Sequence, residues 1–346
     1  MRSPRTPALA PASALTPASA LAPTDDRSPR RALAPVVRPV VPRVLLARDI
    51  PPDDLRARVR DGSLVRVLRG AYAEPATETE PWSAALHLLL CRAVAVHATR
   101  PGVHWFSHRT AAALWGCALD LVPTAVDVTA PVARRSTRDR RRTGVVEHWT
   151  ADARRAAQVT DVLAPPVTSL ARTLVDCAST LPGPSGLVVV DSGLRAGADP
   201  DELRRVLAGS TGQRGIRRAR TVVERGDDRA ESAGESLVRW HLLAQGVPGP
   251  EPQVAVETRL GRRWVDLGWR EERLAVEFDG RTKYGGEGRA AAAAVFAETR
   301  RQDALEEAGW RVLRVTWADL RDPPSLASRV RGALRAVGRG PARSVV

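Results

Sequence analysis

Lysine is almost absent from this chain of 346 residues, in which arginine carries nearly every positive charge. Of the 53 basic residues only one, Lys283, is a lysine. Arginine is a planar cation that stays protonated, whereas lysine is a compact ammonium whose pKa shifts readily. Lys283 is therefore a candidate for orienting a water, acting as a base or stabilising charge on a phosphorane. The alternative is a surface lysine without a chemical role.

Cysteine and long apolar runs are also scarce. The three cysteines, Cys91, Cys117 and Cys177, lie in apolar surroundings without CxxC spacing, which predicts buried free thiols rather than a zinc site. We find no uninterrupted apolar run of about 18 residues, so we expect no membrane partner. Proline interrupts every apolar stretch near the N-terminus, so a signal peptide is not expected there. These absences predict a protein of the reducing cytoplasm.

The net charge of +14 is unevenly distributed. Residues 1–225 contain 33 arginines and 21 acids, a net of +12, whereas residues 226–346 have a net of +2. A basic part attracts nucleic-acid phosphates, and clustered acids hold cations. The division predicts a DNA-binding part followed by a metal-dependent part, although arginine-rich composition can also follow genome base content.

The most informative stretch is Arg263–Gly280, where two apolar, β-favouring segments flank an Arg-Glu-Glu-Arg centre. This pattern predicts a β-hairpin with Glu271 and Glu272 as its two-residue loop. Because side chains alternate along a strand, one face of the hairpin is apolar. That face is predicted to contain Val265, Leu267, Val276 and Phe278.

The other face of the predicted hairpin is acidic. Asp266 is expected directly opposite Glu277, with Asp279 on the same face. Opposed carboxylates repel by roughly 0.2–1 kcal/mol when exposed, and by more when buried, unless a divalent cation binds them. Mg²⁺ prefers carboxylate oxygens, so the pattern predicts a site for Mg²⁺ or Mn²⁺. The alternative is a solvated strand face with scattered acids.

A helix is predicted upstream, ending at Gly246. Glu231 and Glu235 are four residues apart on one stripe of this helix, and Arg239 continues the stripe. A solvated helix face explains the same spacing, so the spacing alone is weak support for a site.

The C-terminal motifs together resemble a known nuclease family. They are Glu231-Ser-Ala-Gly-Glu-Ser-Leu-Val-Arg239, Pro250-Glu-Pro-Gln253, Val265-Asp-Leu-Gly-Trp269, Val276-Glu-Phe-Asp-Gly-Arg-Thr-Lys-Tyr284 and the segment from Arg300 to Trp317. This combination resembles the very-short-patch-repair-like branch of the PD-(D/E)xK nuclease superfamily. The resemblance implies a restriction-endonuclease-like three-layer α/β/α core with a mixed sheet, which binds Mg²⁺ and cleaves DNA.

The same resemblance assigns roles to individual residues. It makes Glu235 the helix acid and Asp266 and Glu277 the strand acids that bind the metal. Two positions depart from the family pattern, because Asp279 and Thr299 stand where the family often has lysine. Lys283 is then the residue that can replace the missing lysine.

A helix followed by a hairpin is predicted near the N-terminus, over Pro51–Gly62 and Leu64–Tyr72. This arrangement is typical of the end of a winged helix, which would contact DNA phosphates through its arginines. The candidates are Arg56, Arg58, Arg60, Arg66 and Arg69. An ordinary helix-hairpin with arginines on its wet face is the alternative.

A second basic segment contains six arginines between two predicted strands. It is interpreted as a loop that either contacts the DNA backbone or is simply solvated. Its candidate DNA-binding residues are Arg134, Arg135, Arg140, Arg141 and Arg142.

Shorter motifs resemble the middle part of AbiEi-type antitoxins, which are transcriptional regulators with an N-terminal winged helix. They are Arg69-Gly-Ala-Tyr72, Phe106–Gly116, Val126-Asp-Val-Thr129 and Val167–Cys177. The resemblance implies a DNA-binding regulator, and an antitoxin would have a toxin protein as partner. Two of these segments also predict helices. The helix in Phe106–Gly116 is expected to be capped by Ser107, and the helix in Val167–Cys177 by Thr168 or Ser169. A further helix is expected to begin at Asp199 as its cap.

The sequence therefore predicts an α+β or α/β multidomain protein in four parts. They are a disordered Ala/Pro/Arg-rich tail (1–43), a winged-helix-like remnant (44–75), an AbiEi-like α+β regulatory domain (76–225) and a nuclease-like domain (226–346). The expected function is Mg²⁺-dependent DNA cleavage with an N-terminal DNA-binding module. A non-catalytic regulator and an antitoxin are the alternatives, and nothing in the pattern specifies an oligomeric state.

Overall fold

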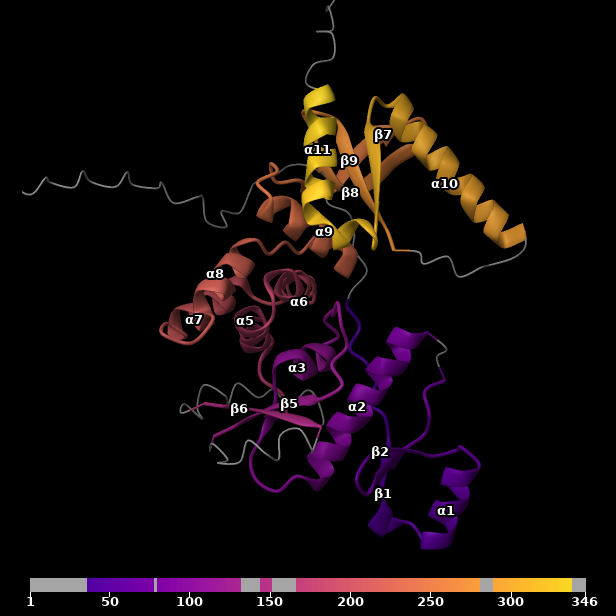
Figure 1. Ribbon diagram of the computed structural model, residues 1–346, viewed down its shortest axis with the longest axis vertical. Helices are drawn as coiled ribbons and strands as arrows, with labels where there is room; N and C mark the ends of the chain where they lie inside the picture. The colour runs from indigo at the N-terminus through magenta and orange to yellow at the C-terminus, as the bar shows by residue number, and fades with distance from the viewer. Residues whose placement is uncertain (1–35, 78–79, 132–143, 151–165, 281–288, 338–346) are drawn as a thin grey trace, which may run out of the picture.

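The structure is a computed structural model that describes residues 36–77, 80–131, 144–150, 166–280 and 289–337, with side chains from 296 onward in the last range. Within these ranges the fold is mixed α/β, and the strands form three sheets. In Figure 1 the sheet nearest the N-terminus lies at one end of the long axis and the C-terminal sheet near the other. The predicted basic loop and Lys283 lie outside the described residues.

The N-terminal unit is a three-stranded sheet of order β1-β3-β2, in which both pairings are antiparallel. Its elements in chain order are β1 (Val44–Leu46), the 3-10 helix η1 (Ala47–Asp49), α1 (Pro52–Arg60), β2 (Val65–Leu68) and β3 (Ala71–Ala73). The predicted helix and hairpin are confirmed. Gly62 ends the helix and Gly70 makes the hairpin turn, with φ of 80° and 75°, a conformation in which glycine has no steric cost.

Helix α2 (Pro81–Thr99) follows, and it is the one described helix that is long and apolar enough to span a membrane by length and composition alone. Its 18-residue window has a mean hydropathy of 1.2. The sequence pattern predicted no such segment, because His87, Arg92 and His97 interrupt the apolar run. A helix at the core of a globular protein meets the same criterion. Residues of α2 lie in two hydrophobic clusters, with Leu89 in one and Cys91 in the other.

The middle unit combines a three-stranded sheet with a group of helices. Its elements are β4 (Trp105–Phe106), α3 (His108–Leu114), β5 (Val126–Ala130), β6 (Val145–Trp149), α5 (Leu170–Thr180), α6 (Gly183–Arg195), α7 (Pro200–Gly209) and α8 (Ile216–Glu224). β5 is central, antiparallel to β4 and parallel to β6. One continuous hydrophobic cluster joins α2, the sheet and these helices. The three cysteines are free and buried, as predicted.

Two of the predicted helix caps are confirmed. The Ser169 hydroxyl accepts a hydrogen bond from the Arg172 amide, and the Asp199 carboxylate accepts one from the Asp201 amide. The predicted side-chain cap by Ser107 is wrong. Ser107 precedes α3 but makes no side-chain cap, and its Oγ lies 2.9 Å from Nδ1 of His108 instead.

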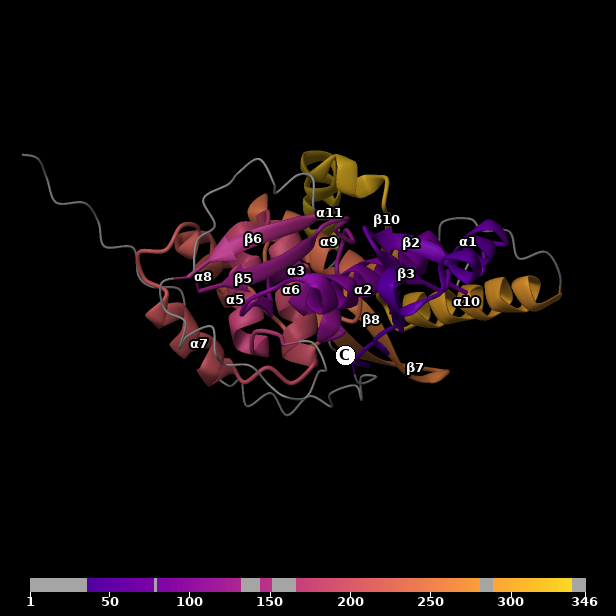
Figure 2. The same ribbon diagram turned by 90° about the horizontal axis from the view of Figure 1, so that it is seen from below.

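The C-terminal unit has helices on both faces of a mixed four-stranded sheet of order β10-β9-β8-β7 (Figures 1 and 2). β10 is parallel to β9, and the other pairings are antiparallel. α9 and α11 cover one face through a large apolar cluster, while α10 packs on the other through Leu305. The elements are α9 (Ala233–Ala244), β7 (Glu251–Thr258), β8 (Gly261–Trp269), β9 (Leu274–Asp279), α10 (Arg289–Glu307), β10 (Arg311–Thr316), the 3-10 helix η2 (Asp319–Arg321) and α11 (Pro323–Val337).

The predicted hairpin and its register are confirmed. The Arg273 amide donates to the Arg270 carbonyl across the two-residue loop, and Leu267 pairs with Val276. The same register puts Asp266 opposite Glu277. The regular ladder ends there, because the Asp266 carboxylate accepts the Phe278 amide at 2.9 Å.

One facing prediction in the hairpin is wrong. Leu267, Val276 and Phe278 belong to the cluster with α9 and α11, as expected, but Val265 packs in the cluster with α10. The physical reason is an irregularity in β7, where Gln253 has a φ of 52° and is skipped in the pairing with β8. The register is the same on both sides of this point, with Pro252 opposite Leu267 and Val254 opposite Val265, so no residue is inserted. The change of face therefore lies in the local backbone where Gln253 and Asp266 interrupt the ladder.

Candidate functional site

Glu235 is fixed in the first turn of α9 by a capping motif. The Ser232 hydroxyl accepts the Glu235 amide at 3.2 Å and donates to the Glu235 carboxylate at 2.8 Å. The other carboxylate oxygen accepts the Glu231 amide at 2.9 Å. This reciprocal pattern satisfies amides that a helix start leaves unpaired. It explains why a buried acid is tolerated at this point.

The close packing of α9 on the sheet depends on a glycine. A Cβ on Gly234 would lie about 2.0 Å from the Phe278 ring, which is closer than atoms can approach. Only glycine therefore brings the first turn of α9 down onto β9 at this depth.

Gln253 connects the helix acid to the sheet. Its side-chain amide donates a hydrogen bond of 3.1 Å to the Glu235 carboxylate. The Gln253 backbone itself has a positive φ, at the point in β7 that faces the irregularity at Asp266. A positive φ at a residue other than glycine costs on the order of 1–3 kcal/mol and is often found at functional sites. The strain was not predictable from the Pro250–Gln253 motif alone.

Glu235 is buried and Asp266 is half-buried, and the charge on Asp266 acts on Glu235. Burial, together with the charge on Asp266, raises the pKa of Glu235 to about 7. Burial likewise raises the pKa of Asp266 to about 6, with the Glu277 carboxylate acting in the same direction. The structure thus gathers the three predicted acids on adjacent elements, with too little positive charge to compensate them.

Arg301 on α10 is the cation that pairs with Glu277. Its guanidinium lies 2.6 Å from Oε1 of Glu277, donates to Oε2 at 2.9 Å, and donates to the Trp264 carbonyl at 2.7 Å. Arg301 lies in the Arg300–Trp317 motif, but the sequence pattern did not predict a role for it. Its position one turn before the buried Leu305 on α10 was the available signal.

A cleft of about 190 Å³ opens beside these residues. It is lined by Asp266, Glu277, Asp279, Glu298, Arg301 and Arg314 among others. The predicted face with Asp266, Glu277 and Asp279 therefore borders one space. Lys283, predicted to act here, lies outside the described residues, so its position relative to the cleft stays a prediction.

The donor set suits a hard cation held by two carboxylates. Within the described ranges, no three His, Cys, Asp or Glu side chains are grouped so as to hold a metal ion. Mg²⁺ usually takes only one or two protein carboxylates and completes its shell with water and phosphate, so Asp266 and Glu277 suffice. Oε1 of Glu277 is buried and makes no well-aligned hydrogen bond, despite the nearby Arg301. Glu235 as a third ligand stays a prediction.

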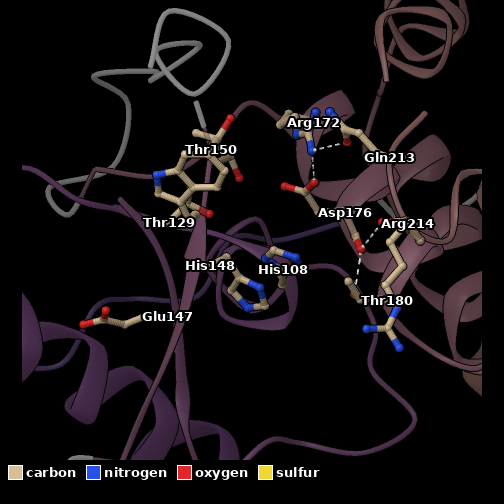
Figure 3. Close-up of a pocket in the computed structure, with 13 residues that line it drawn as sticks. His108, Thr129, Glu147, His148, Thr150, Arg172, Asp176, Thr180, Gln213 and Arg214 are labelled. Carbon is tan, nitrogen blue, oxygen red and sulfur yellow. Dashed lines mark hydrogen bonds and ion pairs between the residues drawn. The ribbon is translucent and has the colours of Figure 1, made fainter. Parts of the chain in front are cut away.

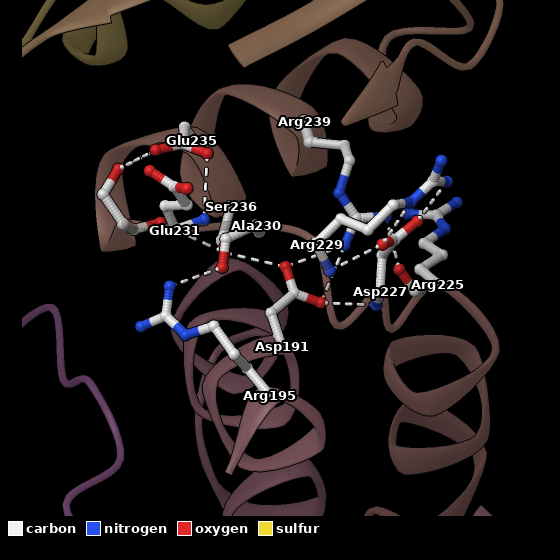
Figure 4. A network of polar contacts seen from close by, with 11 residues as sticks. Asp191, Arg195, Arg225, Asp227, Arg229, Ala230, Glu231, Glu235, Ser236 and Arg239 are labelled. Carbon is white, nitrogen blue, oxygen red and sulfur yellow. Dashed lines mark hydrogen bonds and ion pairs between the residues drawn. The ribbon is translucent and has the colours of Figure 1, made fainter. Parts of the chain in front are cut away.

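The same helix that carries Glu235 is joined to the middle unit by a second polar cluster (Figure 4). Arg239 of α9 donates two hydrogen bonds of 2.7 Å to Asp191 of α6. Asp191 also accepts the Ser236 hydroxyl at 2.7 Å and the Asp227 amide at 2.8 Å. Both charged side chains are almost fully buried. The predicted domain joint at Gly226 thus lies beside a buried ion pair.

The described part of the predicted DNA-binding set lies at the surface. Arg56, Arg60, Arg66 and Arg69 are exposed, and Arg58 is half-buried. Arg56 pairs with Asp53, and Arg66 donates to the Leu68 carbonyl at 3.4 Å. The five candidate arginines of the predicted basic loop lie outside the described residues. Contact of any of them with DNA stays a prediction.

Comparison with known proteins gives relatives but no activity. No family model matches the sequence. The chain is 32% identical over 279 residues to "Uncharacterized protein MT2308" and "Uncharacterized protein Rv2248" from two strains of Mycobacterium tuberculosis, covering 80% of this chain and 94% of each relative. Among solved structures, the RV2827C protein of M. tuberculosis matches with a TM-score of 0.35 and 19% identity, over 53% of this chain and 72% of that one. That similarity is too low to support a conclusion.

Proposed function

The chain belongs to the same family as the M. tuberculosis proteins MT2308 and Rv2248, and for this member we propose Mg²⁺- or Mn²⁺-dependent DNA cleavage. In this proposal residues 226–346 are a restriction-endonuclease-like domain of the very-short-patch-repair-like type. Residues 44–75 are a winged-helix-like remnant, and residues 76–225 are an AbiEi-like regulatory domain.

The observation that carries the proposal is the carboxylate pair of the hairpin, in which Glu277 is buried and Asp266 is half-buried. The register of β8 and β9 puts Asp266 opposite Glu277, both line the cleft, and Asp266 is close enough to Glu235 to raise the pKa of Glu235. A folded protein gains nothing from uncompensated buried carboxylates unless they serve another purpose, since burial and mutual repulsion both disfavour their charged forms.

Each residue of the cluster has a distinct part in the proposed reaction. Asp266 and Glu277 hold the divalent cation, which when bound would activate water and offset charge on the scissile phosphate. Glu235 and Gln253 fix the end of α9 against the strands by their hydrogen bond. Arg301 orients Glu277 and places a permanent positive charge beside the cleft, where it stabilises the anionic phosphate. Lys283 is proposed to complete the site as a general acid–base or charge-stabilising group.

A second candidate function is a DNA-binding regulator or antitoxin that keeps the nuclease fold without cleaving DNA. Two observations favour it. Arg301 contacts both oxygens of Glu277, which a metal would also need, and Asp279 stands at the position where the nuclease family has lysine. In this alternative the cluster is a structural core of charges, and an antitoxin would bind a toxin protein.

A nicking assay separates the two functions. Supercoiled plasmid and oligonucleotide duplexes are incubated with the full chain and Mg²⁺, Mn²⁺ or EDTA. The proposal predicts metal-dependent nicking that Asp266→Asn abolishes and that Glu271→Gln, an exposed acid in the hairpin loop, leaves unchanged. DNA binding without cleavage by the wild type would establish the regulator instead.

A further inference from the structure

A second cavity, of about 660 Å³, lies in the middle unit between the β4-β5-β6 sheet and α5 (Figure 3). Its strand side presents Thr129, Glu147, His148 and Trp149, and its helix side includes Arg172 and Arg214. Small-molecule sites typically occupy roughly 300–1,000 Å³, so the space is large enough for a ligand of moderate size. Neither proposed function uses this cavity.

Two stacked histidines form part of the cavity wall. The rings of His108 and His148 lie 3.5 Å apart between centroids and are nearly parallel, at 17°. His148 Nε2 is 3.0 Å from the buried Asp127 carboxylate, whose other oxygen makes no hydrogen bond. Burial lowers the pKa of His108 to about 3, with the neighbouring His148 acting in the same direction, so His108 is neutral at physiological pH.

The backbone at His108 is strained, with a φ of 51°. Such a conformation is uncommon at residues other than glycine, although histidine adopts it more often than most, and it is often found at ligand sites. Nδ1 of His108 is taken by Ser107 Oγ at 2.9 Å. Its Nε2, which has no hydrogen bond with another described residue, is left for a ligand in the cavity.

Among the described residues that line the cavity, Arg214 is a cation without a partner and Trp149 offers an accessible aromatic face. Asp176 neutralises Arg172, which also donates to Ser210 at 3.3 Å. Arg214, by contrast, makes no hydrogen bond or ion pair within the described part of the chain. Trp149 lines the cavity although 58% of it is exposed to solvent. An exposed indole, a neutral imidazole edge and a single free guanidinium therefore border the same space.

We propose that this cavity binds a nucleobase–phosphate unit, with its phosphate on Arg214 and its base stacked on Trp149 and hydrogen-bonded to His108. A guanidinium offers paired donors that match phosphate oxygens. Aromatic side chains hold bases by stacking without requiring a particular sequence. A single unpartnered cation fits one phosphate rather than a polyanion. The unit comes either from a free mononucleotide or from one unpaired nucleotide of a DNA strand.

The test is calorimetric titration of the full chain with AMP, GMP, CMP and UMP and their deoxy forms, and with a 12-nucleotide single-stranded DNA. Two variants remove the proposed contacts, Trp149→Ala and Arg214→Ala. Two matched controls remove similar exposed residues elsewhere, Trp82→Ala on α2 and Arg217→Ala on α8. Thermal unfolding of all four variants verifies that each is folded.

Loss of base stacking should weaken binding by roughly 5- to 150-fold in Trp149→Ala, and the controls should bind like wild type. Mononucleotide binding with this pattern supports the site and identifies a free nucleotide as its ligand. Single-strand binding with the same pattern, and none to mononucleotides, supports the site with DNA as the source. If no ligand binds, or if Trp149→Ala and Arg214→Ala bind like their controls, the proposal is overturned. DNA cleavage is not measured here, so this result is independent of the nuclease proposal.

Discussion

Helix α9 takes part in two buried carboxylate clusters that are compensated very differently. At α6, one carboxylate, Asp191, receives two hydrogen bonds from Arg239, one from Ser236 and one from an amide. At the sheet, Arg301 pairs with Glu277, while the pKa values of the neighbouring Glu235 and Asp266 carboxyls are both raised, first by burial. The Asp191 carboxylate of the first cluster is fully hydrogen-bonded, although Nε of Arg239 is buried without a hydrogen-bond partner in the described part of the chain. The second cluster has more carboxylates than arginines that pair with them. The comparison distinguishes a structural ion pair from the cluster that we propose to bind a cation.

The largest expected effect is on cleavage by Asp266→Asn. The asparagine carbonyl can still accept the Phe278 amide, so the fold should persist while one metal-binding charge is lost. We expect single-turnover cleavage to fall by at least about 10³-fold. Glu271→Gln serves as the control. Cleavage by Asp266→Asn at the wild-type rate would show that the under-compensated cluster is not the cleavage site.

Lys283→Arg should have the next largest effect on cleavage. Arginine keeps the charge but is larger, and its pKa is too high for proton exchange. A loss of about 10²-fold, with DNA affinity nearly unchanged, is expected from a general acid–base or charge-stabilising role. The same single-turnover assay measures it. An unchanged rate would mean that Lys283 provides only charge.

Breaking the pair of Asp191 and Arg239 should affect stability rather than chemistry. Asp191→Ala leaves Arg239 buried without a counter-ion, which typically costs about 3–5 kcal/mol of unfolding free energy. Replacing both residues, as in Asp191→Leu with Arg239→Met, should cost less because no charge is left buried. Urea unfolding of the full chain measures both variants. A single variant as stable as wild type would contradict the assigned structural role.

Because of Glu235, we expect the stability of the fold to decrease as the pH rises. An acid paired with a cation has the opposite effect, since it stabilises the fold at high pH. The pKa of Glu235 is raised to about 7 in the folded chain, above the usual value of about 4.3, so folding is favoured by its protonated form. The stabilisation that protonated Glu235 gives to the folded chain is fully present below about pH 4 and is lost as the pH rises through 7. Glu235→Gln should therefore be more stable than wild type at pH 8, by on the order of 1–3 kcal/mol, but not at pH 4.

The readout for Glu235 is the difference in unfolding midpoint between variant and wild type across this pH range, without divalent ions. The variant is compared with wild type at each pH because His108 also makes stability depend on pH. Its pKa is lowered to about 3 in the folded chain, so the folded chain becomes less stable as the pH falls below about 6.5. That term is common to both proteins and cancels. Equal midpoints at pH 8 would show that Glu235 is fully compensated by its hydrogen bonds.

The smallest expected effect is on DNA affinity. Arg56→Ala with Arg60→Ala removes two exposed charges from α1, and the slope of log affinity against log salt should become shallower by about 2. Arg259→Ala with Arg262→Ala is the matched control in the C-terminal unit, where both arginines are exposed and paired with acids. An equal change in slope for both pairs would remove the distinction between a DNA-binding and a catalytic part.

The sequence predicted local structure well because short-range chemistry determines it. The Arg-Glu-Glu-Arg loop and the alternation around it were enough to place Asp266 opposite Glu277. The positive φ at Gln253 and the change of face at Val265 were not predictable, because they depend on how β7 meets β8 and α9. Pairings between distant segments were missed for the same reason. Arg301 reaches Glu277 and Arg239 reaches Asp191 only after the helices have packed.

Binding of Mn²⁺ by the full chain at pH 7.5, measured by titration calorimetry, tests the central claim most directly. The account predicts binding to wild type and to Glu271→Gln, and loss of that binding in Asp266→Asn. Absence of Mn²⁺ binding to the wild type at millimolar concentration, or binding that Asp266→Asn leaves unchanged, would contradict the claim that the hairpin carboxylates are reserved for a cation.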